Sequence, residues 1–421
     1  MTTIRTNPVF RLSMLISLVI LTGASVACRA QSRLSLQDAI DKALASRASL
    51  KAEAEEVSAA QGLEKQAGLF ANPMFQFENQ NLRPGQTYSR DVDTYAYLTQ
   101  PLDVLGKRKQ RIASAQQEVN FTAAQYELAR RQVVQAVKHA YWAARGAQEI
   151  RDVLKATVQG FQGVIDYHSA QFSVGAISEQ DFLRIRLEAE RLQIAANLAV
   201  LENTRARVQL FREMGQTDFS EAVLTEILDA GQTPLVPREI QQVLEQHPEI
   251  AVANAALAQA QAQAKLADVA ARPDLSVLYG YKRTQLVDTN NGTNTALAGL
   301  QITLPVTDRN QGNRAAATAE VRRQMQLLAA ARADVLADYY GALQEYQLRR
   351  NEVVETLQPL REHATQISTI AQAAYAQGGT DLLRLLDAQR AQLDAQLAWV
   401  QGMVEYQQSI VNLEAAEGVS Q

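Results

Sequence analysis

Residues 98–102 read Leu-Thr-Gln-Pro-Leu, and residues 302–306 read Ile-Thr-Leu-Pro-Val, so one short motif returns 204 positions later. Further positions repeat in the same order at offsets of 200 to 203: Ile40, Leu44, Leu50 and Pro73 return as Ile240, Leu244, Ile250 and Pro273, and Phe172-x-x-Gly175 returns as Tyr375-x-x-Gly378. Chance does not supply so many ordered matches, and a long internal repeat indicates a duplicated architecture. The sequence therefore predicts two structural repeats, residues 31–216 and 238–421, joined by a connector at 217–237.

The repeated motif ends a predicted β-hairpin in each half. The hairpin segments, about 74–101 and about 274–304, alternate apolar and polar residues with the period of two that is typical of strands. Polar links rich in turn residues, around 83–86 and 288–293, divide each segment into two arms. Arms of about ten residues have the length of a tilted strand that crosses a membrane.

Helices are predicted for the rest of each repeat. A helix of modest length precedes each hairpin, at about 35–70 and about 238–271. A far longer run follows each hairpin, turns at a glycine and returns, so the helical hairpins span about 107–214 and about 312–416, with one continuous outgoing helix expected over 312–376. The returning helices carry apolar residues every seven positions, as coiled coils do: Leu187, Ile194, Leu201 and Val208 in the first half, and Leu386, Leu393 and Val400 in the second.

Composition narrows the possible classes of function. The 421 residues are 47% apolar, carry a formal net charge of −4 and include a single cysteine. The chain has no basic run, so the sequence does not predict nucleic-acid binding. One cysteine excludes a disulfide framework and a thiolate zinc cluster within this chain. No proline occurs between Pro101 and Pro234, which favours long helices.

The first thirty residues have the layout of a secretory signal peptide. Arg5 and Arg11 precede an apolar run that is too short to span a bilayer, and small residues follow up to Ala30. Cleavage after Ala30 is favoured over lipidation at Cys28, because Ser25 stands where a lipidation motif normally has an aliphatic residue. The sequence therefore predicts an exported chain.

Four strands of membrane length in one chain leave two open sheet edges. In lipid, each unpaired backbone group costs several kcal/mol, and a closed barrel requires about eight strands or more. Either several chains share one barrel, or the hairpins are soluble and lie under a helical bundle. Tyrosines in the hairpin segments favour the shared barrel, because tyrosine concentrates at membrane interfaces; these are Tyr88, Tyr95, Tyr97, Tyr279 and Tyr281.

Four local motifs follow the hairpins and the helix turns. They are Gly106-Lys107-Arg108-x-x-Arg111, Asp308-Arg309-Asn310-Gln311-Gly312-Asn313, Val174-Gly175-Ala176 with Asp181-Phe-Leu183, and Tyr375-x-x-Gly378 with Asp387-Ala388. Together with the signal peptide and the duplicated hairpins, the chain resembles the TolC-like outer membrane factors of tripartite efflux systems over nearly its whole mature length. The motifs resemble those of the cobalt–zinc–cadmium resistance branch of that family.

The resemblance implies a mainly α-helical chain with a small membrane β part. Three identical chains would share a twelve-stranded outer-membrane barrel, and their helical hairpins would form a tube across the periplasm. The connector would contribute to a belt around the middle of the tube. The implied function is a passive efflux conduit that works with outer-membrane lipid, a periplasmic adaptor protein and an inner-membrane pump of the RND type.

Nothing in the sequence indicates catalysis or a cofactor. The four histidines form no helical metal-binding pair, and neither a nucleophile elbow nor a phosphate-binding loop occurs. Divalent heavy-metal cations are the substrate that the branch resemblance favours, and organic drug efflux and type I secretion are the alternatives. A periplasmic coiled-coil adaptor and a helical-bundle enzyme are alternatives of other classes; the duplicated hairpins argue against the first, and the missing ligand cluster against the second.

The two helix turns are the expected contact positions for the adaptor. Long antiparallel helices need a tight reversal, and glycine tolerates the left-handed backbone that such reversals use. The resemblance marks the following residues as contact positions: Val174, Gly175, Ala176, Gly378, Gly379 and Thr380.

The resemblance also implies a gate at the periplasmic end of the tube. Asp387, nine residues after Gly378, matches an acidic position that lines this narrow end in the family, and a trimer would place three copies around the axis. Arg384 lies three residues earlier on the same helix face, so it can pair with Asp387 and convert a cation filter into a salt-bridge latch. Tyr375 and Asp181 are the other predicted gate residues.

Overall fold

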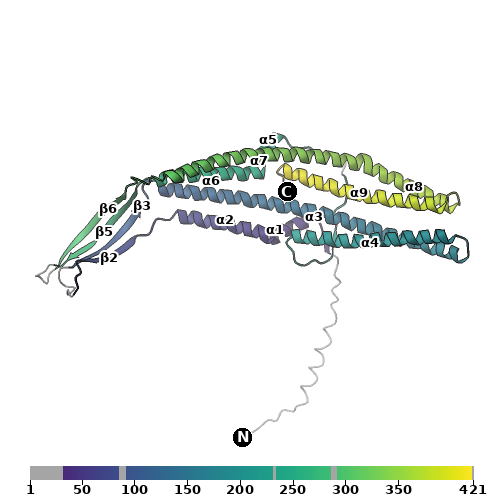
Figure 1. Cartoon of the computed structure of the whole chain (residues 1–421), viewed down its shortest axis with the longest axis horizontal. Coiled ribbons are helices and arrows are strands. Elements are labelled where there is room, and N and C mark those ends of the chain that lie inside the picture. Colours follow the sequence, from purple (N-terminus) through teal and green to yellow (C-terminus); the bar gives the residue numbers. More distant parts are fainter. Residues whose placement is uncertain (1–31, 85–91, 231–233, 286–291, 420–421) are drawn as a thin grey trace, which may run out of the picture.

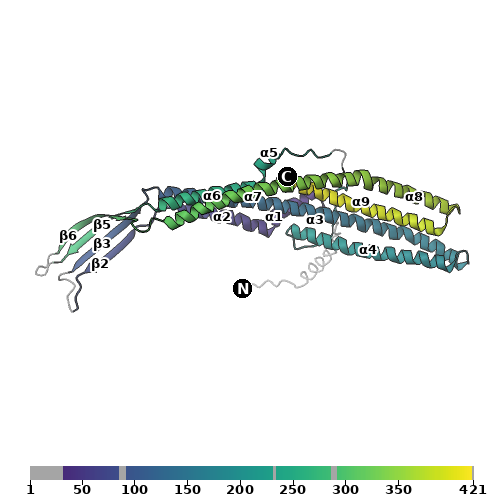
Figure 2. The ribbon, with the colours of Figure 1, turned by 45° about the horizontal axis from the view of Figure 1, so that its top comes forward.

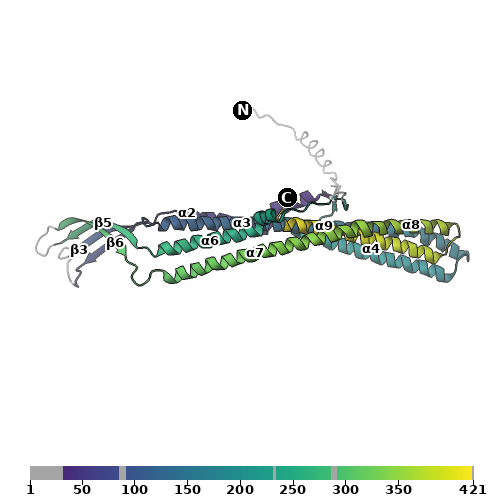
Figure 3. The ribbon, with the colours of Figure 1, turned by 90° about the horizontal axis from the view of Figure 1, so that it is seen from above.

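The computed structural model describes residues 32–84, 92–230, 234–285 and 292–419. The chain is elongated, with a β-sheet at one end and long helices that run from the sheet to two helix turns at the other end (Figure 1). Two further views show the helices running side by side along the same axis (Figures 2 and 3). The predicted mainly helical fold with a small β part is confirmed. The predicted signal peptide and most of both hairpin links lie outside the described residues.

The two predicted β-hairpins join into one antiparallel sheet. The first hairpin consists of β2 (Met74–Gln80) and β3 (Asp93–Leu102), and the second of β5 (Asp274–Thr284) and β6 (Thr293–Thr303). The strand order is β2-β3-β5-β6, so the hairpins meet through β3 and β5. Among the described residues, β2 and β6 are therefore the two edge strands of the sheet.

The register divides the sheet into an apolar and a polar face. Leu98 lies opposite both Phe75 and Tyr279, and Val277 lies opposite Leu300, so these side chains share one face. The opposite face carries more polar groups, which include Gln76, Glu78, Lys282 and Gln301. The tyrosines that favoured the shared barrel are divided between the faces: Tyr279 and Tyr281 belong to the apolar face, Tyr95 and Tyr97 belong to the polar face, and Tyr88 lies outside the described residues.

The first helical hairpin has the predicted form. It consists of α3 (Lys107–Ser173) and α4 (Glu179–Glu213). At 1.5 Å per residue, the 67 residues of α3 extend about 100 Å without interruption. Within the described ranges, no helix is both long and apolar enough to cross a bilayer.

The outgoing helix of the second hairpin is not continuous, contrary to the expectation for 312–376. It consists of α7 (Gln311–Asn351), a π-helical segment η1 (Glu352–Leu357) and α8 (Gln358–Ala376), and it returns as α9 (Leu382–Ala416). Pro359 at the start of α8 has no N–H group to donate to the preceding turn, and a π-helical turn absorbs this mismatch. The expected single helix over 312–376 did not take this proline into account.

The helix before each hairpin is also divided, and both divisions occur at equivalent positions of the two repeats. The first half has α1 (Leu36–Ser46) and α2 (Ala48–Ala67), and the second has α5 (Ile240–Gln246) and α6 (Pro248–Ala270). Arg47 and His247 interrupt the helices with extended backbone, at ψ 117° and 130°. His247 precedes a proline, which disfavours helical backbone at that position. Arg47 is held outside the helix by a 2.8 Å ion pair between its guanidinium and Glu213.

The elements lie side by side in the same order from the sheet to the helix turns: two from the first half, followed by two from the second half. Next to the sheet, the contacts run α2–α3–α6–α7, and towards the helix turns they run α4–α3–α9–α8. The sheet has the same order, β2-β3-β5-β6. First-half elements therefore form one edge of the molecule throughout, and second-half elements form the other.

A short parallel pair of strands, which the sequence analysis did not predict, binds the connector to the start of the described chain. β1 (Ser32–Leu34) pairs with β4 (Ala222–Leu224) against α3. The fully buried Tyr141 hydroxyl donates a hydrogen bond to Leu34 O at 2.9 Å and accepts from the N–H groups of Thr225 and Glu226 at 3.3 and 3.4 Å. Burial raises the pKa of Tyr141, so the hydroxyl keeps its proton for this role. One side chain thus joins three segments at the middle of the molecule.

We expect Tyr141→Phe to lower the stability of the chain by about 1–3 kcal/mol, because it removes the buried hydroxyl that links Leu34 O to the N–H groups of Thr225 and Glu226. Thermal or urea unfolding of the purified protein measures the change. Tyr340→Phe, at a tyrosine that is 51% exposed, is the matched control and should change stability little. Equal unfolding midpoints for the two variants would contradict the assigned role of Tyr141.

Candidate functional site

Both long helices end in the same backbone motif at the end of the molecule opposite the sheet. After α3, the Ala176 N–H donates to Gln171 O at 2.8 Å, and the Gly175 N–H donates to Phe172 O at 3.0 Å. After α8, the N–H groups of Gly379 and Gly378 donate in the same pattern to Ala374 and Tyr375, at 2.8 and 3.0 Å. These are Schellman motifs, which satisfy the last helix carbonyls and reverse the chain.

The glycines are required for backbone conformation rather than for space. Gly175 and Gly378 have φ of +71° and +72°, and a Cβ atom added at either position would meet nothing within 4 Å. A residue other than glycine pays about 1–2 kcal/mol for left-handed backbone. Val174 beside the first turn is 78% exposed. The predicted contact residues of both turns therefore lie at an open end of the chain where a partner has free access.

Side chains cap the first turn of each returning helix, and the predicted gate residue Asp181 takes part in the first of these caps. The Ser178 hydroxyl donates to the Asp181 carboxylate at 2.7 Å and accepts from the Asp181 N–H at 3.1 Å. The Asp381 carboxylate accepts from the Arg384 N–H at 2.9 Å. Asp181 is thus placed in a helix cap at the base of the turn.

The expected pair between Arg384 and Asp387 is not formed in the part of the chain that the structure describes. The Arg384 guanidinium instead lies 4.0 Å from Asp381, and both side chains are mostly exposed. Asp387 is exposed and faces Arg390, whose pKa is raised first by its hydrogen bond to Glu188 and further by Asp387. The spacing of three was compatible with a pair, but the cap residue Asp381 offers Arg384 a nearer acidic partner on the other side.

Tyr375 connects the two helical hairpins. Its hydroxyl lies 2.8 Å from His168 Nε2, and His168 Nδ1 lies 2.7 Å from Val164 O. A carbonyl only accepts, so Nδ1 donates to Val164, and in a neutral ring Nε2 then accepts from the Tyr375 hydroxyl. Burial, followed by the proximity of Tyr167 and Asp181, raises the pKa of Tyr375. The hydroxyl therefore stays protonated and can donate to His168.

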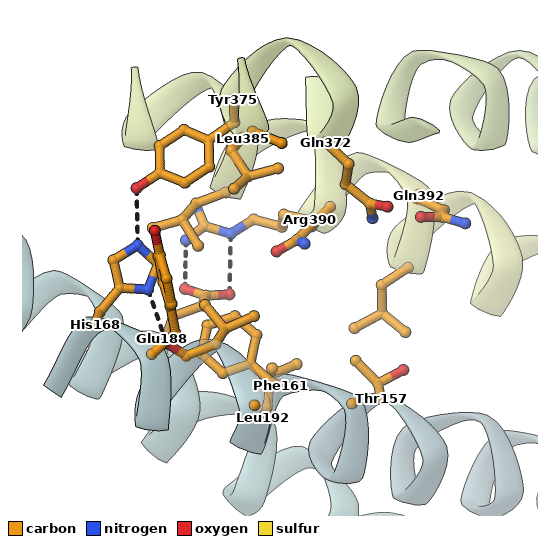
Figure 4. A pocket seen from close by; sticks show the side chains of 18 of the residues that line it. Thr157, Phe161, His168, Glu188, Leu192, Gln372, Tyr375, Leu385, Arg390 and Gln392 are labelled. Atoms are coloured by element: carbon orange, nitrogen blue, oxygen red, sulfur yellow. Dashed lines mark hydrogen bonds and ion pairs between the residues drawn. The ribbon is translucent and has the colours of Figure 1, made fainter. Parts of the chain in front are cut away.

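A cavity of about 770 Å³ lies between the two hairpins beside this contact (Figure 4). Residues of α3, α4, α8 and α9 line it, so both halves of the chain contribute to its wall. The Arg390 guanidinium spans from α9 to α4 and donates to the Glu188 carboxylate at 2.5 Å. Glu188 is only 12% exposed and also accepts from Arg191 at 3.3 Å. Beside this cavity the two hairpins are thus joined by the hydrogen bond between Tyr375 and His168 and by the ion pair between Arg390 and Glu188.

The sequence analysis did not identify His168, Glu188 or Arg390 as linking residues. A signal for His168 was present, because Leu154, Phe161 and His168 are spaced by seven and all three are buried. No comparable signal marked Glu188 and Arg390, which are 202 residues apart in the sequence. No cluster of potential metal ligands, with three or more His, Cys, Asp or Glu side chains, occurs among the described residues.

Comparison with known proteins places the chain among outer-membrane channels. The profile of the family described as "Outer membrane efflux protein" matches residues 39–216 and again 240–419. The cobalt-zinc-cadmium resistance protein CzcC of Cupriavidus metallidurans is 26% identical over 369 residues, which cover 87% of this chain and 86% of the relative. The outer membrane protein OprJ of Pseudomonas aeruginosa is 24% identical over 340 residues, which cover 75% of this chain and 67% of OprJ.

A solved structure has the same fold. The crystal structure of CusC superposes with a TM-score of 0.75 at 18% identity, over 91% of this chain and 92% of that one.

We expect Gly175→Ala and Gly160→Ala to change stability in opposite directions. Gly175→Ala forces alanine into left-handed backbone and should cost about 1–2 kcal/mol. Gly160 lies within α3 with open space at the Cβ position, so Gly160→Ala should add about 0.5–1 kcal/mol through helix propensity. Thermal unfolding of both variants measures the difference. A loss of stability in both would show that Gly160 is needed for a contact rather than for the helix.

Proposed function

The chain belongs to the outer membrane efflux protein family, and on this premise we propose that it is the outer-membrane channel of a tripartite efflux system. One observation carries the proposal: the strands and the helices lie side by side in the same order, with first-half elements at one edge and second-half elements at the other. Both edges are therefore open to a neighbouring molecule along the whole length of the chain. Such a chain would form one part of the wall of a tube, and further copies would be needed to close the tube. In this proposal it conducts substrate passively, and a partner protein supplies the energy.

The open sheet edges support assembly into a trimer. Unpaired backbone groups on β2 and β6 cost several kcal/mol each in lipid. If β2 of one copy pairs with β6 of the next, three copies supply twelve strands, which is within the size range of closed membrane barrels. The apolar face of the sheet would then face lipid, since it carries Phe75, Leu98 and Tyr279.

The helices at the two edges of the chain, α4 on one side and α7 with α8 on the other, also expose apolar surface that a neighbouring copy would cover. In α4, Ile185 and Leu192 are buried within the chain, whereas a second apolar seam is exposed: Leu183, Leu187, Ile194, Leu198, Leu201 and Val208. The edge formed by α7 and α8 also exposes large apolar side chains: Tyr340, Leu348, Leu360, Ile367 and Ile370. A seam spaced by seven packs well against another helix. We assign the α4 seam of one copy to the α7–α8 edge of the next.

The end that carries the two turns is the proposed docking end for a periplasmic adaptor and an RND-type pump. The turns combine fixed left-handed glycines with exposed neighbours such as Val174, and thus present a rigid and accessible surface. Asp387 is the proposed gate residue, with Tyr375, Arg384 and Asp181 nearby. Since Asp387 is exposed within one chain, its carboxylate is free to face the axis of a trimer. Three carboxylates around a narrow pore attract cations.

Divalent heavy-metal cations are the proposed substrate. Similarity to the cobalt-zinc-cadmium resistance protein CzcC supports this class, and an acidic chain favours cations. A deletion strain should lose resistance to zinc, cobalt or cadmium and should keep its resistance to a panel of organic drugs. If the deletion strain becomes sensitive to the drugs alone, the substrate is a drug rather than a metal, and the proposal of an efflux channel still holds.

We expect Leu187→Asp combined with Ile194→Asp to convert the trimer into monomers. Each lost contact removes about 1.5–3 kcal/mol of apolar burial, and each aspartate adds a buried charge to the interface. Light scattering during gel filtration in detergent gives the mass. Val174→Asp is the control, because it introduces an aspartate at an exposed apolar residue outside the seam. An intact trimer of the double variant would exclude the α4 seam from the interface.

We expect Asp387→Asn to weaken the cation selectivity of the channel in planar bilayers, because it removes three negative charges from the proposed ring. Arg384→Gln should have little effect, since its 4.0 Å contact with Asp381 is largely exposed and worth at most about 1 kcal/mol. Unchanged conductance and selectivity in both variants would mean that neither residue gates the pore. An effect of Arg384→Gln alone would instead support a latch.

A further inference from the structure

The segments that join the sheet to the helices combine exposed apolar side chains with an excess of positive charge. We define this junction as residues 68–73, 103–111, 268–274 and 304–314. It contains seven basic and four acidic residues, a formal excess of three positive charges in a chain whose net charge is −4. The same segments expose large apolar side chains to 38–70% of their surface: Leu69, Phe70, Val104, Leu105, Leu304 and Val306.

Three of the seven cations are neutralised within the chain. Lys107 Nζ lies 2.6 Å from Asp274, Arg111 lies 3.4 Å from Asp103, and Arg314 lies 2.6 Å from Asp268. The fourth acidic residue, Asp308, accepts a hydrogen bond from the Asn310 N–H. Among the described residues, four cations of the junction therefore have no carboxylate partner: Arg108, Lys109, Arg272 and Arg309.

These four side chains lie in the segments that join the sheet to the helices, and three of them contact residues of those segments. Arg272 donates to Leu105 O at 2.6 Å, and Arg309 donates to Val306 O at 3.3 Å, so both guanidinium groups lie beside exposed apolar residues. The Arg108 guanidinium lies 4.4 Å from the centre of the Phe70 ring, and Phe70 is 67% exposed. Lys109, Arg272 and Arg309 are themselves exposed. A cation next to an apolar surface can contact a lipid phosphate while its neighbours contact acyl chains.

The backbone adds to the positive potential. Both α3 and α7 begin in the junction, and neither has an acidic residue in its first turn. The helix dipole disfavours cations at this end, yet α3 opens with Lys107, Arg108 and Lys109. An external anion bound at the N-terminus of α3 would reduce the electrostatic repulsion among these cations and the helix dipole.

We propose that the junction binds the headgroups of anionic phospholipids in the leaflet that faces the helices. The proposal rests on the membrane-embedded sheet of the proposed function and deepens it, because it names the lipid class that the base of the sheet selects. Two observations support the proposal: the cations of the junction are complementary to an anionic headgroup, and the junction is continuous with the apolar face of the sheet. The phosphate of an anionic glycerophospholipid matches the unpaired cations, whereas the acyl chains match Leu304, Val306 and the sheet above them.

The experiment compares lipid retention by the purified full-length protein in nanodiscs that contain equal amounts of phosphatidylcholine and phosphatidylglycerol. The test variant is Lys109→Gln combined with Arg309→Gln, whose side chains take part in few contacts. The matched control is Lys155→Gln combined with Arg184→Gln, which removes the same charge from exposed positions on α3 and α4 outside the junction. Native mass spectrometry counts the lipids of each kind that remain bound.

The wild-type protein and the control should retain phosphatidylglycerol preferentially, and the test variant should retain it more weakly by about fivefold for each charge removed. Salt should reduce the preference, since headgroup attraction is screened. Equal retention in all three proteins overturns the proposal. So does a changed ion selectivity of the test variant with unchanged lipid retention, because these cations would then line the pore. A protein that enters no membrane would refute the proposed function, whereas insertion without lipid preference refutes only this inference.

Discussion

The unpaired backbone of the two sheet edges is the constraint on which the rest of the structure depends. Four strands cannot close on themselves, and β2 and β6 both need a partner of the right polarity and length. The helices repeat the lateral order of the strands, so in the proposed assembly the neighbour that completes the sheet would also meet the exposed seam of α4. One rotation between identical copies would then satisfy the polar requirement of the sheet and the apolar requirement of the helices together.

Duplication explains how one chain obtains two complementary edges. Each half supplies a strand hairpin, a divided helix and a helical hairpin. The halves are joined in the middle by contacts between α3 and α9, where Lys138 Nζ lies 2.7 Å from Glu414 and His139 Nε2 lies 2.8 Å from Asn412. The halves are not copies in detail. Towards the turns they are held together by Tyr375 with His168 and by Arg390 with Glu188, contacts that have no counterpart in the repeat. Selection has therefore kept the scaffold similar and made the contacts between the halves specific.

The spacing of apolar residues predicted the helices and strands well, because apolar residues recur on the face of a helix or strand that packs against other residues. Alternation identified the strands of the sheet, and the spacing of seven identified α4 and α9. The features that were missed depend on groups far apart in sequence: the break at Arg47 requires Glu213, the strand β1 requires β4, and Arg384 prefers Asp381 to Asp387. The candidate site was therefore predicted as positions at two turns, whereas the ion pair and the cavity between the hairpins became evident only in three dimensions.

The π-helical segment gives the two halves different mechanical properties. α3 is a continuous rod of 67 residues, whereas the equivalent part of the second half contains η1, where six residues follow a wider turn. Arg349 bonds to both Glu352 and Glu405 at 2.8 Å, which clamps the start of η1 to α9. We therefore expect a sideways force on the tip of the second hairpin to bend its outgoing helix first just beyond that clamp, at residues 353–357. The first hairpin has no such segment in α3, so we expect it to be the stiffer of the two.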